Sequence, residues 1–295
     1  MDTLLQALVS TITQGSILAL ISIGMTLVYG TLRVLNMTQG AMVMLGGFAA
    51  YSTLQIANVS VWLSILVAVL VTFALGMLTY FIAVKPLVGR RGVDFEMTAF
   101  ISTFAAATII QNVVLLVYGP RQKPFDPVIP GVIQITDTVS ITWQSILMNV
   151  VAIAALLLLA LFLNRSRYGL AITAVAQNLE AARLMGIPAR RVYALTMGIA
   201  CALAGVAGVL LAPIYFVSPN AGDLPLLQSL IVVIFAGLGS VRGTIYAAYI
   251  IGFIQSVVSI YWGTAYALPV LYVIILIVLV IRPYGLAGKP QEARL

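Results

Sequence analysis

Apolar runs that are long enough to cross a bilayer recur along this chain and constrain its fold more than any other feature. The hydrocarbon core of a bilayer is about 30 Å thick and a helix rises about 1.5 Å per residue, so a crossing needs roughly 20 apolar residues. Hydrophobic residues make up 62% of the chain and charged residues only 8%, whereas a soluble domain is about 25% charged. The sequence therefore predicts an integral membrane protein.

Glycines, prolines and charged residues divide the chain into helical segments. We expect these segments at residues 6–30, 40–57, 61–84, 97–118, 143–163, 193–217, 226–238, 244–262 and 266–281. Segment 226–238 is too short for a full crossing and is followed by Gly237, Gly239 and Gly243, which predicts a half-helix or a bent pair. The predicted fold class is all-α: one polytopic transmembrane helical bundle over residues 1–295, with eight to ten helical elements, some broken or half-spanning.

The basic residues predict the orientation, because lysine and arginine are retained on the cytoplasmic side of a membrane. Three segments are therefore expected in the cytoplasm, and they carry Lys85, Arg90, Arg91; Arg165, Arg167, Arg183, Arg190, Arg191; and Arg282, Lys289, Arg294. Nine crossings would place the N-terminus outside and the C-terminus inside. The first apolar run is expected to be a span rather than a cleaved signal, because Met1, Asp2 and Thr3 provide no basic region before it.

The residues that are missing exclude several classes of function. The chain has no histidine, and every acidic residue falls at a loop or helix end, so no intramembrane proton relay is expected. It has no phosphate-binding loop for ATP, no histidine-dependent hydrolase site and a single cysteine, Cys201. We therefore expect no enzyme activity, no metal, no cofactor and no nucleic-acid partner. The energy for transport must come from a partner, or transport is passive.

A charged island at about 164–192 separates two apolar runs. Residues 168–185 alternate apolar and polar types, and Gly186 and Pro188 end the pattern, which predicts one or two short amphipathic helices at the cytoplasmic face. Glu180, Arg183, Arg190 and Arg191 could pair with charges of another protein, and Ala181 and Ala182 would allow its close approach. The alternative is an ordinary solvated loop that its arginines keep inside.

Asn36, Thr38 and Gln39 form a polar cluster between two apolar runs. Asn36 or Thr38 could cap the next helix and turn its positive end toward a carboxylate or a polar solute, which makes the cluster a candidate substrate path. The alternative is a structural cap that satisfies backbone groups. Other polar residues within the spans could also line a path or bond across helices, namely Gln111, Asn112, Gln228, Gln255 and Ser256. Ala200, Ala204 and Gly208 recur every four residues and predict close helix packing.

Four segments resemble one known family. Glu180-Ala181-Ala182 with Gly186 resembles the coupling-loop motif of ATP-binding-cassette importer permeases, and residues 174–213 resemble the LivH-type branched-chain amino acid permeases. Residues 24–30 with 35–40 resemble the first span and turn of that family, residues 237–240 its glycine turn, and residues 282–286 its end. Where family members commonly carry an aromatic residue and a histidine, this chain has Met37 and Gln39.

The resemblance implies an inner-membrane importer of bacteria with several subunits. A periplasmic solute-binding protein would deliver the solute, this chain would pair with a second, LivM-like permease or with itself, and two cytoplasmic ATPases would drive transport. Glu180, Ala181, Ala182 and Gly186 would carry the coupling role; Arg183, Arg190 and Arg191 are added from their charge and position. The implied substrates are branched-chain or other amino acids, with urea, amides or aromatic acids as alternatives.

Two hypotheses from other classes of function remain open. A stand-alone passive channel would need only a polar lining, but it leaves the Glu180–Ala182 motif unexplained. A lipid-modifying enzyme would need catalytic acids, and the only close acidic pair is Asp94 and Glu96. Residues two apart on a helix do not face each other, so this pair is a poor candidate.

Overall fold

The computed structural model describes residues 2–57, 59–89, 94–125, 129, 131–136, 139–282 and 285–287. Its helices are α1 (Asp2–Leu32), α2 (Thr38–Ala50), α3 (Val61–Thr79), α4 (Phe95–Tyr118), α5 (Trp143–Arg165), α6 (Arg167–Gln177), α7 (Leu179–Leu184), α8 (Ala189–Tyr215), α9 (Asp223–Ala236), α10 (Val241–Tyr261) and α11 (Thr264–Ile281). Short π-helical and 3-10 stretches extend α2 and α3: η1 (Tyr51–Ile56), η2 (Tyr80–Val84) and η3 (Lys85–Leu87). Two strands, β1 (Val132–Thr136) and β2 (Val139–Thr142), form an antiparallel hairpin.

The all-α membrane fold is confirmed, and each of the nine expected segments corresponds to a helix. In the described part of the chain, seven helices are long and apolar enough to cross a membrane. The other two segments are α2, which reaches a spanning length only with η1, and the half-helix α9. Of the one or two short helices expected near residues 168–185, two are present, α6 and α7. The total exceeds eight to ten because both of these form, and the β1–β2 hairpin was not expected.

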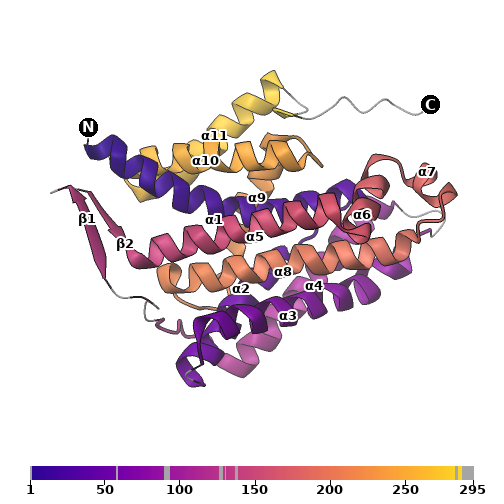
Figure 1. The fold of residues 1–295 in the computed structure, drawn as a ribbon, viewed down its shortest axis with the longest axis horizontal. Coiled ribbons are helices and arrows are strands. Elements are labelled where there is room, and N and C mark those ends of the chain that lie inside the picture. Colours follow the sequence, from indigo (N-terminus) through magenta and orange to yellow (C-terminus); the bar gives the residue numbers. More distant parts are fainter. Residues whose placement is uncertain are drawn as a thin grey trace.

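Two helices form the centre of the bundle (Figure 1). In the most apolar stretch of each helix, 89% of α1 residues and 78% of α8 residues are buried inside the chain, against 17% for α4 and for α11. The outer helices expose leucine, isoleucine, valine and phenylalanine along their length, among them Leu116 and Val280. Lipid can cover such apolar faces, whereas α1 and α8 are covered by other helices of the chain.

Glycines allow α2 to lie directly against α8. A Cβ on Gly46 would meet the backbone of Gly205, and a Cβ on Gly208 would overlap the carbonyl oxygen of Val43. The expected small-residue stripe is confirmed as a packing surface, because Ala200 and Ala204 are fully buried. Backbones that approach this closely gain dispersion contacts, the main attraction between helices in lipid.

The two ends of the bundle differ in the elements they carry. The N-terminus and the β1–β2 hairpin lie at one end, and α6 and α7 lie at the other (Figure 1). The ends of α1 and η3 and the start of α4 lie with α7, because Arg33, Val88, Phe95 and Leu179 line one hollow. The expected cytoplasmic segments that the structure describes thus share an end; Arg90, Arg91, Lys289 and Arg294 lie outside the described residues. Which end faces the cytoplasm stays a prediction.

Candidate functional site

A cavity of about 520 Å³ opens among α1, α2, α8, α9 and α10 at the end that carries the N-terminus. We call it the outer cavity. Its lining along α1 runs from Gln6 to Ile21, and Tyr215, Phe216 and Leu224 close it from the α8–α9 connection. Aliphatic and aromatic side chains dominate the wall, and no described residue that lines it is charged. The cavity therefore suits a solute with an apolar part and no net charge.

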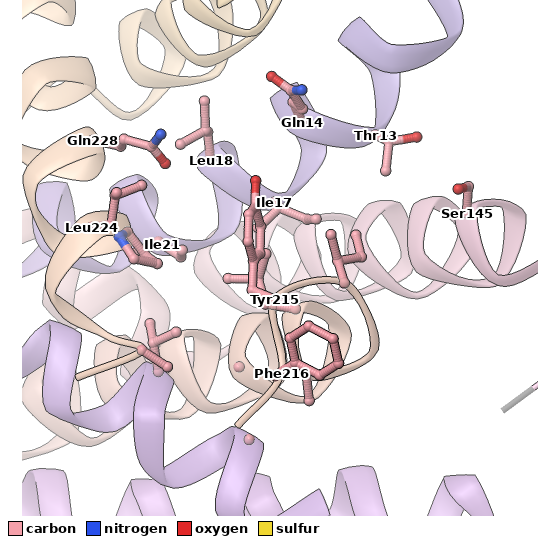
Figure 2. Close-up of a pocket in the computed structure, with 18 of the residues that line it drawn as sticks. Thr13, Gln14, Ile17, Leu18, Ile21, Ser145, Tyr215, Phe216, Leu224 and Gln228 are labelled. Carbon is pink, nitrogen blue, oxygen red and sulfur yellow. The ribbon is translucent and has the colours of Figure 1, made fainter. Parts of the chain in front are cut away.

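Polar groups on this wall are carboxamides and hydroxyls. Gln14 of α1, Gln228 of α9 and the Tyr215 hydroxyl surround one open space in Figure 2. Gln255 of α10 also lines the cavity; it is 5% exposed, and its Nε2 has no hydrogen-bond partner in the described structure. Two of the polar residues predicted from sequence, Gln228 and Gln255, thus line the cavity. Gln14 and Tyr215 were missed, because each resembles an ordinary residue within an apolar run.

The predicted substrate-path cluster is fully buried at the start of α2. The Asn36 Oδ1 accepts hydrogen bonds from the Thr38 backbone N–H at 3.1 Å and from the Thr38 hydroxyl at 2.6 Å. The Gln39 Nε2 donates to the carbonyl oxygens of Ile21 at 3.2 Å and Ala200 at 3.1 Å. None of these three side chains lines the outer cavity in the described structure. The geometry of Asn36 and Thr38 is that of a structural turn, so their role in the path stays a prediction.

The other predicted polar residues lie apart from the cavity. The Gln111 Nε2 donates to the Asp223 carboxylate at 2.7 Å, which joins α4 to the start of α9. The Asn112 Nδ2 donates to the Thr108 carbonyl oxygen within α4. Ser256 is buried on α10 beside Gln255, but it does not line the cavity. The polar side chain of Gln111 therefore bonds two helices and does not line the cavity.

A second hollow, of about 1060 Å³, opens at the opposite end of the bundle. We call it the inner hollow. It is bounded by residues Gly30–Arg33 of α1, by the start of α4 and by α6, α7 and Tyr193 of α8. Its wall is charged, with Arg33, Asp94, Glu96, Glu180 and Arg183. Such a surface is solvated in the resting protein and can face a soluble partner.

The predicted coupling loop forms one wall of the inner hollow. Glu180, Ala181, Arg183 and Gly186 are exposed on α7 and the turn that follows it, and Arg190 and Arg191 are exposed in the first turn of α8. Ala182 differs from the expectation of a partner contact: its side chain is 4% exposed and packs against its own chain. The apolar side chains that protrude here are Leu184 and Met185, which are 89% and 84% exposed. Their exposure was not predicted, because both residues fit the apolar positions of the pattern at residues 168–185.

Local backbone chemistry fixes the shape of this loop. The Asn178 Oδ1 accepts the backbone N–H groups of Glu180 and Ala181, both at 3.1 Å, and so caps α7. Gly186 has a φ of +79°, which L-residues rarely adopt. Its N–H donates to Arg183 and the next N–H, of Ile187, donates to Ala182, so two end carbonyls of α7 are satisfied.

Glycine segments that are far apart in the sequence meet at the inner end of the bundle. Gly30 of α1 lies beside Gly239, which follows α9. Gly285 packs on the backbone of Gly237, and the next N–H groups, of Leu286 and Ala287, donate to the Phe235 and Ala236 carbonyl oxygens at 2.9 Å each. These bonds satisfy the end of the half-helix α9. Three of the segments that carry the family resemblance therefore form one contact.

Comparison with known proteins decides the family. The model of the family described as "Branched-chain amino acid transport system / permease component" matches residues 7–279. The chain belongs to this permease family. It is 31% identical over 97% of its length, and 96% of the relative's, to the high-affinity branched-chain amino acid transport system permease protein BraD of Pseudomonas aeruginosa. It is 30% identical, over the same shares, to the protein LivH of Escherichia coli K12, which carries the same description.

The fold of this permease also resembles that of a solved structure. The structure described as PsaBC from Streptococcus pneumoniae in complex with Fab matches 96% of this chain and 93% of its own chain, with a TM-score of 0.50 and 15% sequence identity. At that identity the likeness shows the fold alone. Together with the seven candidate spans, the family establishes a multi-pass membrane permease of a transport system.

Proposed function

We infer that this permease subunit imports neutral, aliphatic amino acids, the branched-chain ones first, through the outer cavity. The observation that carries this proposal is the cavity wall: apolar side chains with carboxamides and hydroxyls, and no charge on any described lining residue. A zwitterionic amino acid has no net charge, and its side chain gains by leaving water for an apolar wall. The names of BraD and LivH support the same substrate class.

The proposed energy source is a pair of cytoplasmic ATPases that bind the α6–α7 loop, with a solute-binding protein on the outer face and a second permease subunit or a second copy. The chain lies in the bacterial inner membrane with α7 in the cytoplasm. The supporting feature is the loop itself: Leu184 and Met185 protrude from a capped, charged helix, which is a shape that fits a partner groove. ATP-driven closure of the ATPases would move α7 and switch the bundle between outward and inward opening.

The first experiment isolates the complex in mild detergent from its native membrane and identifies its subunits by mass. An ATPase and a binding protein are expected, and the complex in proteoliposomes should then import leucine only with ATP and the binding protein. Competition by isoleucine and valine, and none by urea or benzoate, is expected. Recovery of this chain alone, with ATP-independent uptake, would favour a passive channel and refute the coupling role.

A matched pair of variants tests the loop. Leu184→Glu places a charge on the proposed docking helix, and Leu238→Glu places the same charge on another exposed leucine, beside the Gly237 turn at the same end. Loss of the ATPase from the first complex only is expected, because a buried unpaired charge opposes docking. Retention of the ATPase by both variants would contradict docking at α7.

A further inference from the structure

The outer cavity and the inner hollow are separated by a layer of packed helices. On α1, the outer cavity ends at Ile21 and the inner hollow begins at Gly30. On α8, the lining of the outer cavity starts at Gly208, whereas the only residue of α8 in the inner hollow is Tyr193. A solute that crosses the protein along these helices must therefore pass the layer between these positions.

The Gln39 side chain occupies this layer. Its Nε2 donates to the carbonyl oxygen of Ile21 on α1 and to that of Ala200 on α8. Ile21 itself lines the floor of the outer cavity, and Val43, one turn after Gln39 on α2, lines it too. Ile21 and Ala200 each lie about 11 residues, or roughly 16 Å of helix, from the inner ends of α1 and α8. Gln39 therefore lies directly below the cavity floor.

Close packing leaves no room around this carboxamide. Gln39 is 0% exposed. A Cβ added at Gly24 would lie 2.5 Å from the Gln39 Nε2 and 2.8 Å from the Ala200 carbonyl oxygen. Glycine at this position thus lets α1, α2 and α8 converge on one side chain. The convergence closes the layer both sterically and by hydrogen bonds.

The hydrogen bonding of Gln39 is incomplete. Its Oε1 has no partner in the described structure, although the atom is buried. A buried acceptor without a partner keeps its desolvation cost, which offsets part of what the two donated bonds contribute. A contact of this kind holds the helices together without fixing them permanently, as a gate must.

We propose that Gln39 is the gating residue of this permease: its carboxamide joins α1 and α8 across the path, and the path opens to the inner hollow when these two bonds break. Gln39 acts by positioning the helices, and its role as gate rests on the proposed transport function. In this role, Gln39 of the buried polar cluster acts on the path without lining the outer cavity.

The test measures passive leak from proteoliposomes that contain the complex and no nucleotide. The vesicles are loaded with radiolabelled leucine, and co-trapped calcein reports vesicle integrity. Gln39→Glu keeps the size of the side chain but removes the donor, and Gln39→Met keeps the size without charge or hydrogen bonds. Gln55→Glu, the same change at an exposed glutamine of η1 that lines neither hollow, is the matched control. Both Gln39 variants should release leucine at least about tenfold faster than the wild type, and Gln55→Glu should not.

Two results would overturn the proposal. One is an equal leak from wild type and from Gln39 variants that are monodisperse and retain the thermal midpoint of the wild type. The other is the failure of both Gln39 variants to give a monodisperse complex while Gln55→Glu does, since Gln39 would then serve the fold rather than the path. Import driven by ATP is measured on the wild type in parallel. Its absence would refute the proposed function, whereas the leak ratio would still decide the role of Gln39.

Discussion

The outer cavity and the inner hollow lie on the same helices but are built in different ways. The outer cavity is an uncharged hollow between long helices, and glycine contacts such as that between Gly208 and the Val43 carbonyl hold its walls. The inner hollow is charged and is bounded by short helices and turns, whose shape depends on caps such as Asn178. Under the proposed function, solute selection would depend on rigid helix packing, and the response to a soluble partner would depend on a capped loop.

The largest effect is expected when the chemistry of the two regions is exchanged. Ile17→Glu places a carboxylate in the outer cavity wall, where the side chain is 6% exposed. An unpaired buried charge costs several kcal/mol, so leucine uptake should fall by two orders of magnitude or more and the thermal midpoint should drop.

The paired change for the inner hollow is Glu96→Gln, which removes a charge from an exposed residue. Uptake and thermal midpoint should stay near the wild-type values, because exposed charges contribute about 0–1 kcal/mol. Similar losses of leucine uptake per folded complex in Ile17→Glu and Glu96→Gln would show that the two regions tolerate a change of charge equally.

A smaller effect tests the glycine packing of the outer cavity wall. Gly208→Ala forces a methyl group against the backbone of Val43 and should cost about 1–3 kcal/mol. A Cβ added at Gly47 of α2 would lie 3.5 Å from its nearest neighbour, the Gly208 carbonyl oxygen, which is an ordinary contact distance. Gly47→Ala should therefore change the free energy of unfolding little. Thermal unfolding in detergent followed by fluorescence measures both. Equal stability of the two variants would contradict the close approach of α2 and α8.

The turn after α7 should respond to a change in backbone preference alone. Gly186→Ala places a Cβ at a φ of +79° and should destabilise the turn by about 1–2 kcal/mol, with lower ATP-dependent uptake. Gly186→Asn should be milder, because asparagine tolerates this region better than other L-residues. Nothing lies within 4 Å of the added Cβ, so an equal loss for both variants would indicate contact with a partner rather than strain.

The smallest expected effect concerns the start of α7. Asn178→Ala removes the side-chain cap and should destabilise the short helix by about 1 kcal/mol, with the cavity unchanged. Amide hydrogen exchange should then be faster at residues 179–184 and unchanged in α8. The neighbouring variant Gln177→Ala, which removes no cap, is the control. Faster exchange across the whole bundle would show that the loop and the core are one cooperative unit.

The sequence predicted the helices well because the bilayer imposes their length. All nine apolar segments and the helical loop between Arg165 and Ala189 are present. The β1–β2 hairpin escaped prediction, since its four- and five-residue strands carry too short a pattern. Arg183, Gly186 and Glu180 are exposed as expected, whereas Ala182 faces its own chain, because α7 folds back on the molecule.

The cavity was only partly predictable. Gln228 and Gln255 stood out as polar residues within spans, but Gln14 and Tyr215 line the cavity as well, and Asn36 and Thr38 do not. Which face of a helix meets a cavity depends on how that helix is rotated against its neighbours. In a chain that is apolar on all faces, hydrophobic periodicity does not report this rotation.

The sequence alone was enough to identify a multi-pass permease, to place its spans to within four residues, and to find the charged loop, because these properties depend on bilayer thickness and on composition along the chain. The tertiary structure was needed to see that α1 and α8 form the centre, that an uncharged cavity lies between α1, α2, α8, α9 and α10, and that Gln39 meets both Ile21 and Ala200. Those features arise where helices distant in the sequence pack against each other, and packing depends on the shapes of both partners.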